Sequence, residues 1–249
     1  MYDFQKANMW KRISAALFDF ILLCIIVVGV ALLLSTVLGY DGYIVKFDAL
    51  KDSYVEKYDI NLEKDYTSLT EEEKVKYDEA DKAFANDSEA VYLNSMIINL
   101  GFVIVVFSVL LGYLLLEFLI PLIFKNGQTL GKKIFGIAVM RMDGVRLSPL
   151  LLFVRTVLGK YTVETMVPIL IVIMIIARIM GIIGTVAIIA LFIIQVVLLI
   201  VTKARTPLHD KLAHTVVVDY ASQMIFDTPE ELMAYKQRIH AEQVESEKN

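Results

Sequence analysis

Long apolar segments alternate along this chain with shorter segments rich in charge. Four of the apolar segments are long enough, or nearly so, to cross about 30 Å of hydrocarbon as helices. We place these spans at residues 13–38, 96–124, 163–179 and 185–201. The last two are separated only by RIMGIIG, in which Arg178, Gly181 and Gly184 supply a charge and two flexible positions. This interruption predicts a tight turn and therefore a helical hairpin.

Two short segments outside the spans favour β-structure. Residues 137–142 and 215–218 are rich in β-branched and other apolar residues, and Asp143-Gly144 after the first is a strong turn signal. We expect these segments to pair as a small two-stranded element on the cytoplasmic side of the membrane.

A further helix is predicted directly after that element. Ser148 and Pro149 provide an N-cap and a first-turn proline for residues 150–161. Arg155 and Lys160 suit a helix that lies at the membrane interface.

Residues 41–94 form an acidic insert between the first two spans. They contain seven lysines against fifteen carboxylates, and Thr70 with Glu73 forms a capping box that predicts a helix. The insert is interpreted either as a cation-attracting vestibule or as a solvated helical hairpin.

After residue 221, Thr228 and Pro229 are predicted to begin a second charged helix. This helix lies in a C-terminal tail that is either solvated or binds a partner.

Composition and charge distribution place the chain among small multi-pass membrane proteins. Hydrophobic residues make up 57% of its 249 residues, and charged residues 21%. Basic residues concentrate in 6–12, 125–160 and 203–211, which the positive-inside rule assigns to the cytoplasm together with both termini. The insert is then outside. We therefore expect an all-α fold of four spans in a domain at 1–220, followed by a tail at 221–249.

Several kinds of chemistry are not expected. Cys24 is the only cysteine, which excludes internal disulfides and thiolate metal sites. The sequence GQTLGKK lacks the glycine spacing and the hydroxyl residue of a phosphate-binding loop. No nucleophile with a matching histidine and acid stands out, so we expect no enzyme, no metal, no cofactor and no nucleic-acid partner.

Three polar residues lie at similar depth within the predicted spans. Asp19 follows Arg12 by seven residues on nearly the same helix face, about 10 Å deeper at 1.5 Å per residue. Glu117 and Gln195 each lie eight residues before a basic residue, about 12 Å deep. Such a layer could bind sodium or share a proton, because intramembrane acids are usually functional. The alternative is that Asp19 only pairs with Arg12 or Lys11 and that Gln195 only bonds across helices.

His209 and Asp210 form a third candidate site near the end of the last span. A histidine beside a carboxylate can relay protons near neutral pH. The alternative is structural, with Asp210 accepting hydrogen bonds from Arg12, Arg155 or backbone amides.

These residues carry a resemblance to the RDD family of bacterial membrane proteins, named for one arginine and two aspartates. The matching positions are Arg12 and Asp19 in KRISAALFDFIL and Asp210 in ARTPLHDKLAHTVVV, with GQTLGKKIFGIAVMRMDG between them. The chain departs from the family in having His214 where glycine is common, and in its long acidic insert. The resemblance implies a transport role, with sodium/proton antiport suggested for some members.

The sequence thus favours ion-linked transport, with sodium ions or protons as ligands, in a bacterial inner membrane. The alternative is a non-transporting assembly or accessory module in which Arg12, Asp19 and Asp210 form a structural lock. Four helices are too few to enclose a wide transport pathway. This favours either a homo-oligomer or assembly with a membrane partner protein. A lipid bilayer is the expected surrounding in every case.

Overall fold

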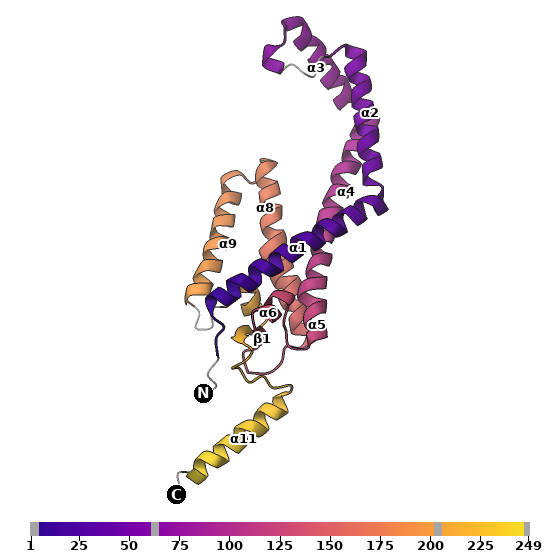
Figure 1. Cartoon of the computed structure of the whole chain (residues 1–249). Coiled ribbons are helices and arrows are strands. Elements are labelled where there is room, and N and C mark those ends of the chain that lie inside the picture. Colours follow the sequence, from indigo (N-terminus) through magenta and orange to yellow (C-terminus); the bar gives the residue numbers. More distant parts are fainter. Residues whose placement is uncertain (1–4, 61–64, 202–205, 247–249) are drawn as a thin grey trace. The chain divides into compact units, whose positions relative to one another are not determined.

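A computed structural model describes residues 5–60, 65–201 and 206–246 of the chain (Figure 1). The remaining residues, which include part of the basic segment 203–211, lie outside the described part. The structure divides into two compact units. One unit comprises Met1–Val27 and Val109–Asn249, and the other comprises Val28–Ser108. Helices α1 (Met9–Leu38) and α4 (Ser88–Tyr113) contribute residues to both.

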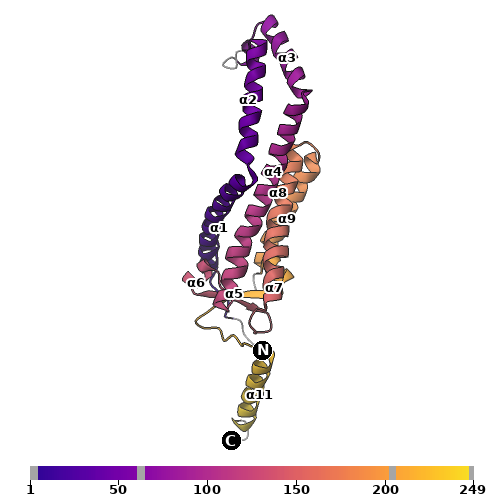
Figure 2. The same ribbon diagram turned by 90° about the vertical axis from the view of Figure 1, so that its right-hand side faces the viewer.

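The unit at Val28–Ser108 consists of helices that include the acidic insert. Besides its parts of α1 and α4 it contains α2 (Tyr40–Tyr58), the short 3₁₀ helix η1 (Tyr66–Ser68) and α3 (Glu71–Ala85). The predicted capping box is present, because the Thr70 hydroxyl accepts from the Glu73 amide and the Glu73 carboxylate accepts from the Thr70 amide. Helices α2 and α3 contact one another (Figure 2), with Phe84 packed edge-on against Phe47 and Tyr54.

The other unit holds the remaining helices and the sheet. Its further elements are η2 (Leu114–Leu119), α5 (Ile120–Phe124), α6 (Leu130–Ile134), β1 (Ile137–Arg141), α7 (Pro149–Phe153), η3 (Val154–Met166), α8 (Val167–Ile176), α9 (Gly181–Val201), α10 (Leu208–Leu212), β2 (Thr215–Asp219) and α11 (Pro229–Ser246). Segments η2 and η3 are π-helical and continue the neighbouring helices without a break.

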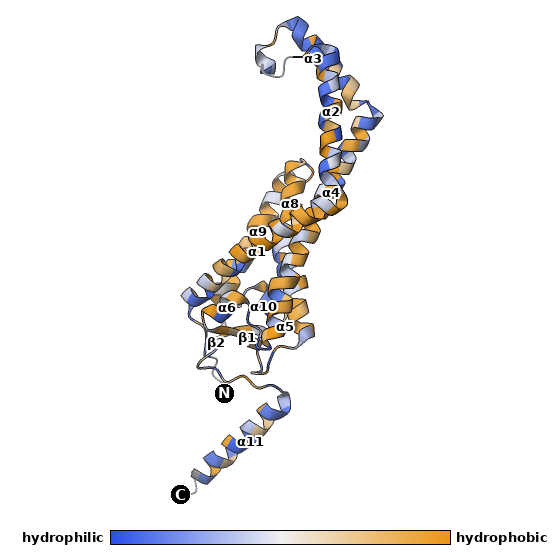
Figure 3. Ribbon diagram, turned by 45° about the vertical axis from the view of Figure 1, so that its right-hand side comes forward, coloured by the Kyte–Doolittle hydropathy of each residue, from blue (hydrophilic) through white to orange (hydrophobic). Residues whose placement is uncertain are grey.

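Four helices are long and apolar enough to cross a membrane, as predicted, although their bounds differ from the expected ones. They are Met9–Leu38, Ser88–Phe124, Pro149–Ile176 and Gly181–Leu198. Hydrophobic residues cover α8 and α9, whereas α3 is mostly hydrophilic (Figure 3). The predicted hairpin between the last two spans is present: Arg178 and Gly181 adopt positive φ angles of 58° and 47° in the turn from α8 to α9.

The predicted interfacial helix over 150–161 is not a separate element. The Ser148 hydroxyl caps it as expected, but the helix continues through η3 into α8 as one span from Pro149 to Ile176. The reason is that Arg155, which suggested an interface, is buried with only 2% exposure and is paired inside the protein. A paired charge does not need to reach the headgroups.

The predicted pairing of the two β-prone segments is confirmed. Strands β1 and β2 are antiparallel, with Val139 opposite Val217. Buried apolar side chains cover both faces of this sheet, which makes it the centre of the core in this unit. His214 precedes β2 with φ of 52°, a left-handed conformation that favours glycine, so the histidine is accommodated with backbone strain.

Candidate functional site

The carboxylate of Asp19 on α1 is held by the start of the short helix α6. Its Oδ2 accepts a hydrogen bond from the Thr129 hydroxyl, and its Oδ1 accepts one from the Gly131 amide at 2.8 Å. Thr129 is also the N-cap of α6, since its hydroxyl accepts from the Lys132 amide. This arrangement explains the GQTLGKK segment: its backbone and hydroxyl donors bind a carboxylate from another helix of the same chain.

Gly131 is required for this close approach. A Cβ atom at this position would meet the Ala15 carbonyl oxygen and would lie 2.8 Å from Asp19 Oδ1. Both contacts involve atoms of α1 that cannot move away without breaking the Asp19 hydrogen bonds. The glycine therefore sets the distance between α6 and α1.

Lys132 lies between two carboxylates from different helices. Its Nζ is 3.7 Å from Asp19 Oδ2 and 3.6 Å from Glu117 Oε2, and it donates to the Thr129 hydroxyl at 3.1 Å. Only 9% of its side chain is exposed. The two acids that the sequence placed at similar depth are thus brought together, but a lysine outside the predicted site joins them.

Glu117, in the π-helical segment η2, has two further cationic partners. Lys160 donates to its Oε1, and Arg155 Nη1 lies 3.5 Å from its Oε2. Arg155 also donates from Nε to Asp210 Oδ1 at 2.7 Å, and this oxygen accepts from the Thr215 hydroxyl as well. Arg155 therefore links η2 to α10.

The π-helical winding of η3 places three ionisable residues on one face. In an α-helix, nine residues turn through about 900°, so Arg155 and Glu164 would point in opposite directions. In a π-helix hydrogen bonds join residues five apart, so Arg155, Lys160 and Glu164, spaced by five and four, share a face. The Thr165 hydroxyl follows the same spacing and donates to the carbonyl of Lys160, five residues earlier. All three residues of this face line the cavity described below.

Glu164 binds His209 at two points. One carboxylate oxygen accepts from the His209 backbone amide at 3.0 Å, and the other lies 2.7 Å from His209 Nδ1. His209 Nε2 is 3.7 Å from Asp210 Oδ1. Gln195 on α9 hydrogen-bonds the Glu164 carboxylate, and Gly159 leaves room for α10, since a Cβ there would lie 2.6 Å from His209 Cβ.

Burial controls the charge states of the groups outside the spans. Burial lowers the pKa of Lys132 to about 8, against the attraction of Glu117, which raises it. Burial also lowers the pKa of His209 from its ordinary value, against the attraction of Asp210, which raises it. For Asp210, burial alone would raise the pKa, but the Arg155 guanidinium outweighs it and holds the pKa of this carboxyl well below its usual range.

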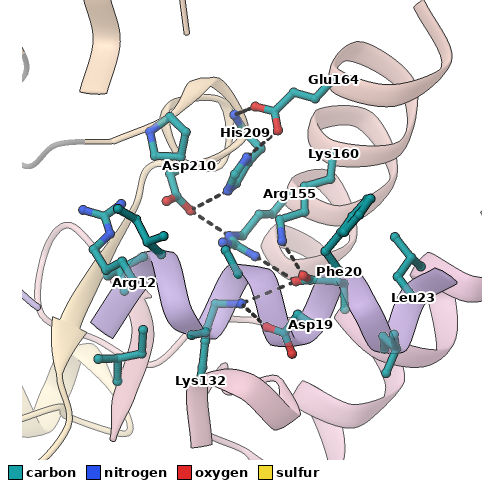
Figure 4. Close-up of a pocket in the computed structure, with 18 of the residues that line it drawn as sticks. Arg12, Asp19, Phe20, Leu23, Lys132, Arg155, Lys160, Glu164, His209 and Asp210 are labelled. Atoms are coloured by element: carbon teal, nitrogen blue, oxygen red, sulfur yellow. Dashed lines mark hydrogen bonds and ion pairs between the residues drawn. The ribbon is translucent and has the colours of Figure 1, made fainter. Parts of the chain in front are cut away.

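These side chains line one cavity of about 370 Å³ (Figure 4). Its ionisable walls comprise four carboxylates, four cations and a histidine: Asp19, Glu117, Glu164, Asp210, Arg12, Lys132, Arg155, Lys160 and His209. Without the histidine, the formal charges of the four carboxylates and the four cations balance. Few helix bundles bury so many ionisable side chains, because a buried charge destabilises the protein unless it is paired with an opposite charge.

The cavity contains most of the residues that the sequence singled out. Arg12, Asp19, Glu117, His209 and Asp210 all line it, whereas Gln195 reaches it only through Glu164. Lys11, one of the expected partners of Asp19, instead pairs with Asp219 at 2.8 Å. Each of the four carboxylates in this part of the structure contacts a cation or the histidine, so a sodium ion that bound there would have to displace one of these partners.

Four members of the cluster were not among the predicted site residues. Lys132 belongs to the segment predicted as a basic loop, Lys160 to the predicted interfacial helix, and Glu164 to the start of the predicted third span. Arg155 was predicted as a possible donor to Asp210, and that hydrogen bond is present. The available signal was the excess of basic residues in the segment 125–160, because the acids predicted within the spans need cationic partners when they are buried.

Comparison with known proteins gives one match. A model of the RDD family matches residues 6–214. Neither the comparison with curated proteins nor the comparison with solved structures found a match. The matched range includes every residue that lines the cavity except Val217, and it includes Arg12, Asp19 and Asp210, which the fold brings to one site. The chain therefore belongs to the RDD family, a family of membrane proteins.

Proposed function

We propose that this protein exchanges protons for a small monovalent cation, with sodium as the leading candidate, at Lys132. The observation that supports it is the position of Lys132 Nζ, 3.7 Å from Asp19 and 3.6 Å from Glu117. An ammonium group between two carboxylates occupies the position that a bound cation would take. Asp19, Glu117 and the Thr129 hydroxyl offer the hard oxygen ligands that suit such an ion.

The exchange keeps the charge of the site constant. When a sodium ion binds the two carboxylates, Lys132 releases one proton to the cavity water, so one positive charge enters as another leaves. When the sodium ion departs, the amine takes up a proton and restores both ion pairs. A lysine suits this role because burial lowers its pKa toward the working pH.

The test is sodium-driven proton movement in liposomes that contain the purified full-length protein. Lumenal pH is followed after sodium-loaded vesicles are diluted into sodium-free buffer, and acidification is expected. Lys132→Arg keeps a positive charge but cannot release its proton, so its flux should fall to that of empty liposomes. Lys133→Arg is the matched control, because Lys133 is exposed and its Nζ lies over the Phe124 ring. It should retain wild-type flux.

Wild-type flux in a folded Lys132→Arg protein would reject Lys132 as the exchanging group. An inactive wild-type protein would reject transport and support the second candidate, a non-transporting assembly module. That candidate is favoured by a specific observation: the buried ion pairs join α1, α6, η2, η3 and α10 to one another, as a structural lock would. Folding of each variant is checked by its melting temperature.

We further infer that both termini and the loop 125–148 face the cytoplasm of a bacterial inner membrane. The support is the five basic residues of that loop against the acidic insert. Single cysteines at Ser68 and Ser222 in a Cys24→Ser background test this orientation. Only the cysteine at position 68 should react with an impermeant maleimide added to intact cells. Labelling at 222 alone would reverse the orientation.

A further inference from the structure

We propose that the cavity also binds the headgroup of a membrane lipid that carries a primary amine beside its phosphate, as an ethanolamine phospholipid does. The inference does not depend on the proposed ion exchange, because binding is measured without any ion gradient. Three features of the cavity lead to it: an unsatisfied buried oxygen, an apolar wall on α1, and a balanced set of charges.

The unsatisfied oxygen belongs to Asp210. This residue is fully buried and lines the cavity. Its Oδ1 accepts from Arg155 and Thr215, whereas its Oδ2 has no hydrogen-bond partner within the described part of the chain. A buried carboxylate oxygen without a donor is costly, so a donor from outside the chain would be favoured there. An ammonium group supplies up to three such donors.

The apolar wall indicates that the ligand comes from the bilayer. Ile13, Phe20 and Leu23 of α1 line the cavity, and residues Ile13 and Phe20 are 50% and 60% exposed. The cavity lies near the first turns of a membrane-spanning helix, because Met9 and Arg12 also line it. This is the level at which headgroups meet hydrocarbon. A lipid can therefore place its acyl chains along α1 and its headgroup inside the cavity.

The charges favour a zwitterion. The four carboxylates and four cations of the cavity already balance, so a ligand with one positive and one negative charge leaves the balance unchanged. Arg12 and Asp210 both line the cavity (Figure 4). The planar guanidinium of Arg12 carries five donors and can bind a phosphate in addition to its contacts within the chain. The amine then faces Asp210 and the phosphate faces Arg12.

Native mass spectrometry of the full-length protein in detergent tests the proposal by titration with dioctanoyl lipids. The ethanolamine lipid is compared with the choline lipid, which has no N–H donor, and with the glycerol lipid, which is anionic. We expect the ethanolamine lipid to bind about tenfold more tightly than either, the change expected for one hydrogen bond to a charged group. Equal affinity for the choline lipid, or tighter binding of the glycerol lipid, would overturn the assignment.

Variants on α1 locate the binding site. Ala16→Phe fills the cavity from a small residue of its wall, and should weaken ethanolamine-lipid binding about tenfold. Leu17→Phe is the matched control, because Leu17 is 59% exposed and is not among the lining residues, and it should bind as the wild type does. If Ala16→Phe does not fold, Phe20→Ala serves as a second variant. It should weaken binding of the ethanolamine lipid, because it removes part of the apolar wall. Unchanged binding in the folded cavity variant, or equally tight binding of free phosphoethanolamine, would overturn a lipid site in this cavity.

Discussion

Replacing Arg155 with methionine is expected to destabilise the folded protein by about 3–5 kcal/mol, the usual cost of breaking a buried ion pair. Arg155 is 2% exposed and contacts both Asp210, at 2.7 Å, and Glu117, at 3.5 Å. Its removal leaves the Asp210 carboxylate buried with only a hydroxyl and the distant His209 ring as neighbours. In detergent, the melting temperature should fall by roughly 6–20 °C.

Arg141→Met is the matched control for this measurement. Arg141 also forms an ion pair, with Asp143, but the two side chains are 35% and 44% exposed. Water already solvates such a pair, so its loss should cost about 1 kcal/mol or less. In the double variant Arg155→Met/Asp210→Asn the uncompensated charge is gone, and part of the lost stability should return. Equal effects of Arg155→Met and Arg141→Met would show that the buried pair does not hold the fold together.

The second large effect concerns the pH dependence of stability at Lys132. Burial lowers the pKa of this lysine to about 8 in the folded protein, against 10.5 for an unperturbed lysine. Between these two pH values the unfolded chain retains a proton that the folded protein has released. The unfolded state then binds more protons, so the contribution of Lys132 to stability rises with pH across this window. The shift corresponds to about 3 kcal/mol in total.

Comparison of the wild type with Lys132→Met isolates this contribution. The wild type should gain stability relative to Lys132→Met as the pH rises from about 8 to about 10, in thermal unfolding of detergent-solubilised protein. Lys133→Met removes a neighbouring lysine outside the cluster and should give a curve parallel to that of the wild type. A constant difference between wild type and Lys132→Met over this range would contradict the perturbed charge state of Lys132.

Much of the fold followed from local patterns. The apolar segments predict four spans because length and composition alone decide whether a helix can cross hydrocarbon. The capping box of Thr70 and Glu73, the Ser148 cap and the pairing of 137–142 with 215–218 were also recognised, because each depends on neighbouring residues or on β-propensity. The helix that contains the predicted third span begins at Pro149 and not at 163, and the buried pairing of Arg155 with a distant residue gave no local signal of this continuation.

The candidate site was predicted only in part, and the reason is the helical period. A constant rise along each helix put Asp19 and Glu117 at similar depth, and both lie against Lys132. The same reasoning assumes an α-helical rotation of about 100° per residue, which would place Arg155 and Glu164 on opposite faces of the helix. Only the π-helical winding of η3 puts them on one face, and winding of this kind is too rare to assume from a sequence.

The sequence by itself determined the membrane class, the four apolar helices long enough to span a membrane, the two strands and the resemblance to the RDD family. The tertiary structure decided which charges meet: it selected Arg155 from the partners that the sequence offered for Asp210, and it added Lys132, which the sequence did not offer for Asp19. Partners such as Lys132 with Asp19, or Arg155 with Asp210, are 113 and 55 positions apart, and no local propensity links them. They are brought together because a carboxylate buried between helices needs a cation or a donor, and the packing of α6, η3 and α10 around α1 and η2 supplies it.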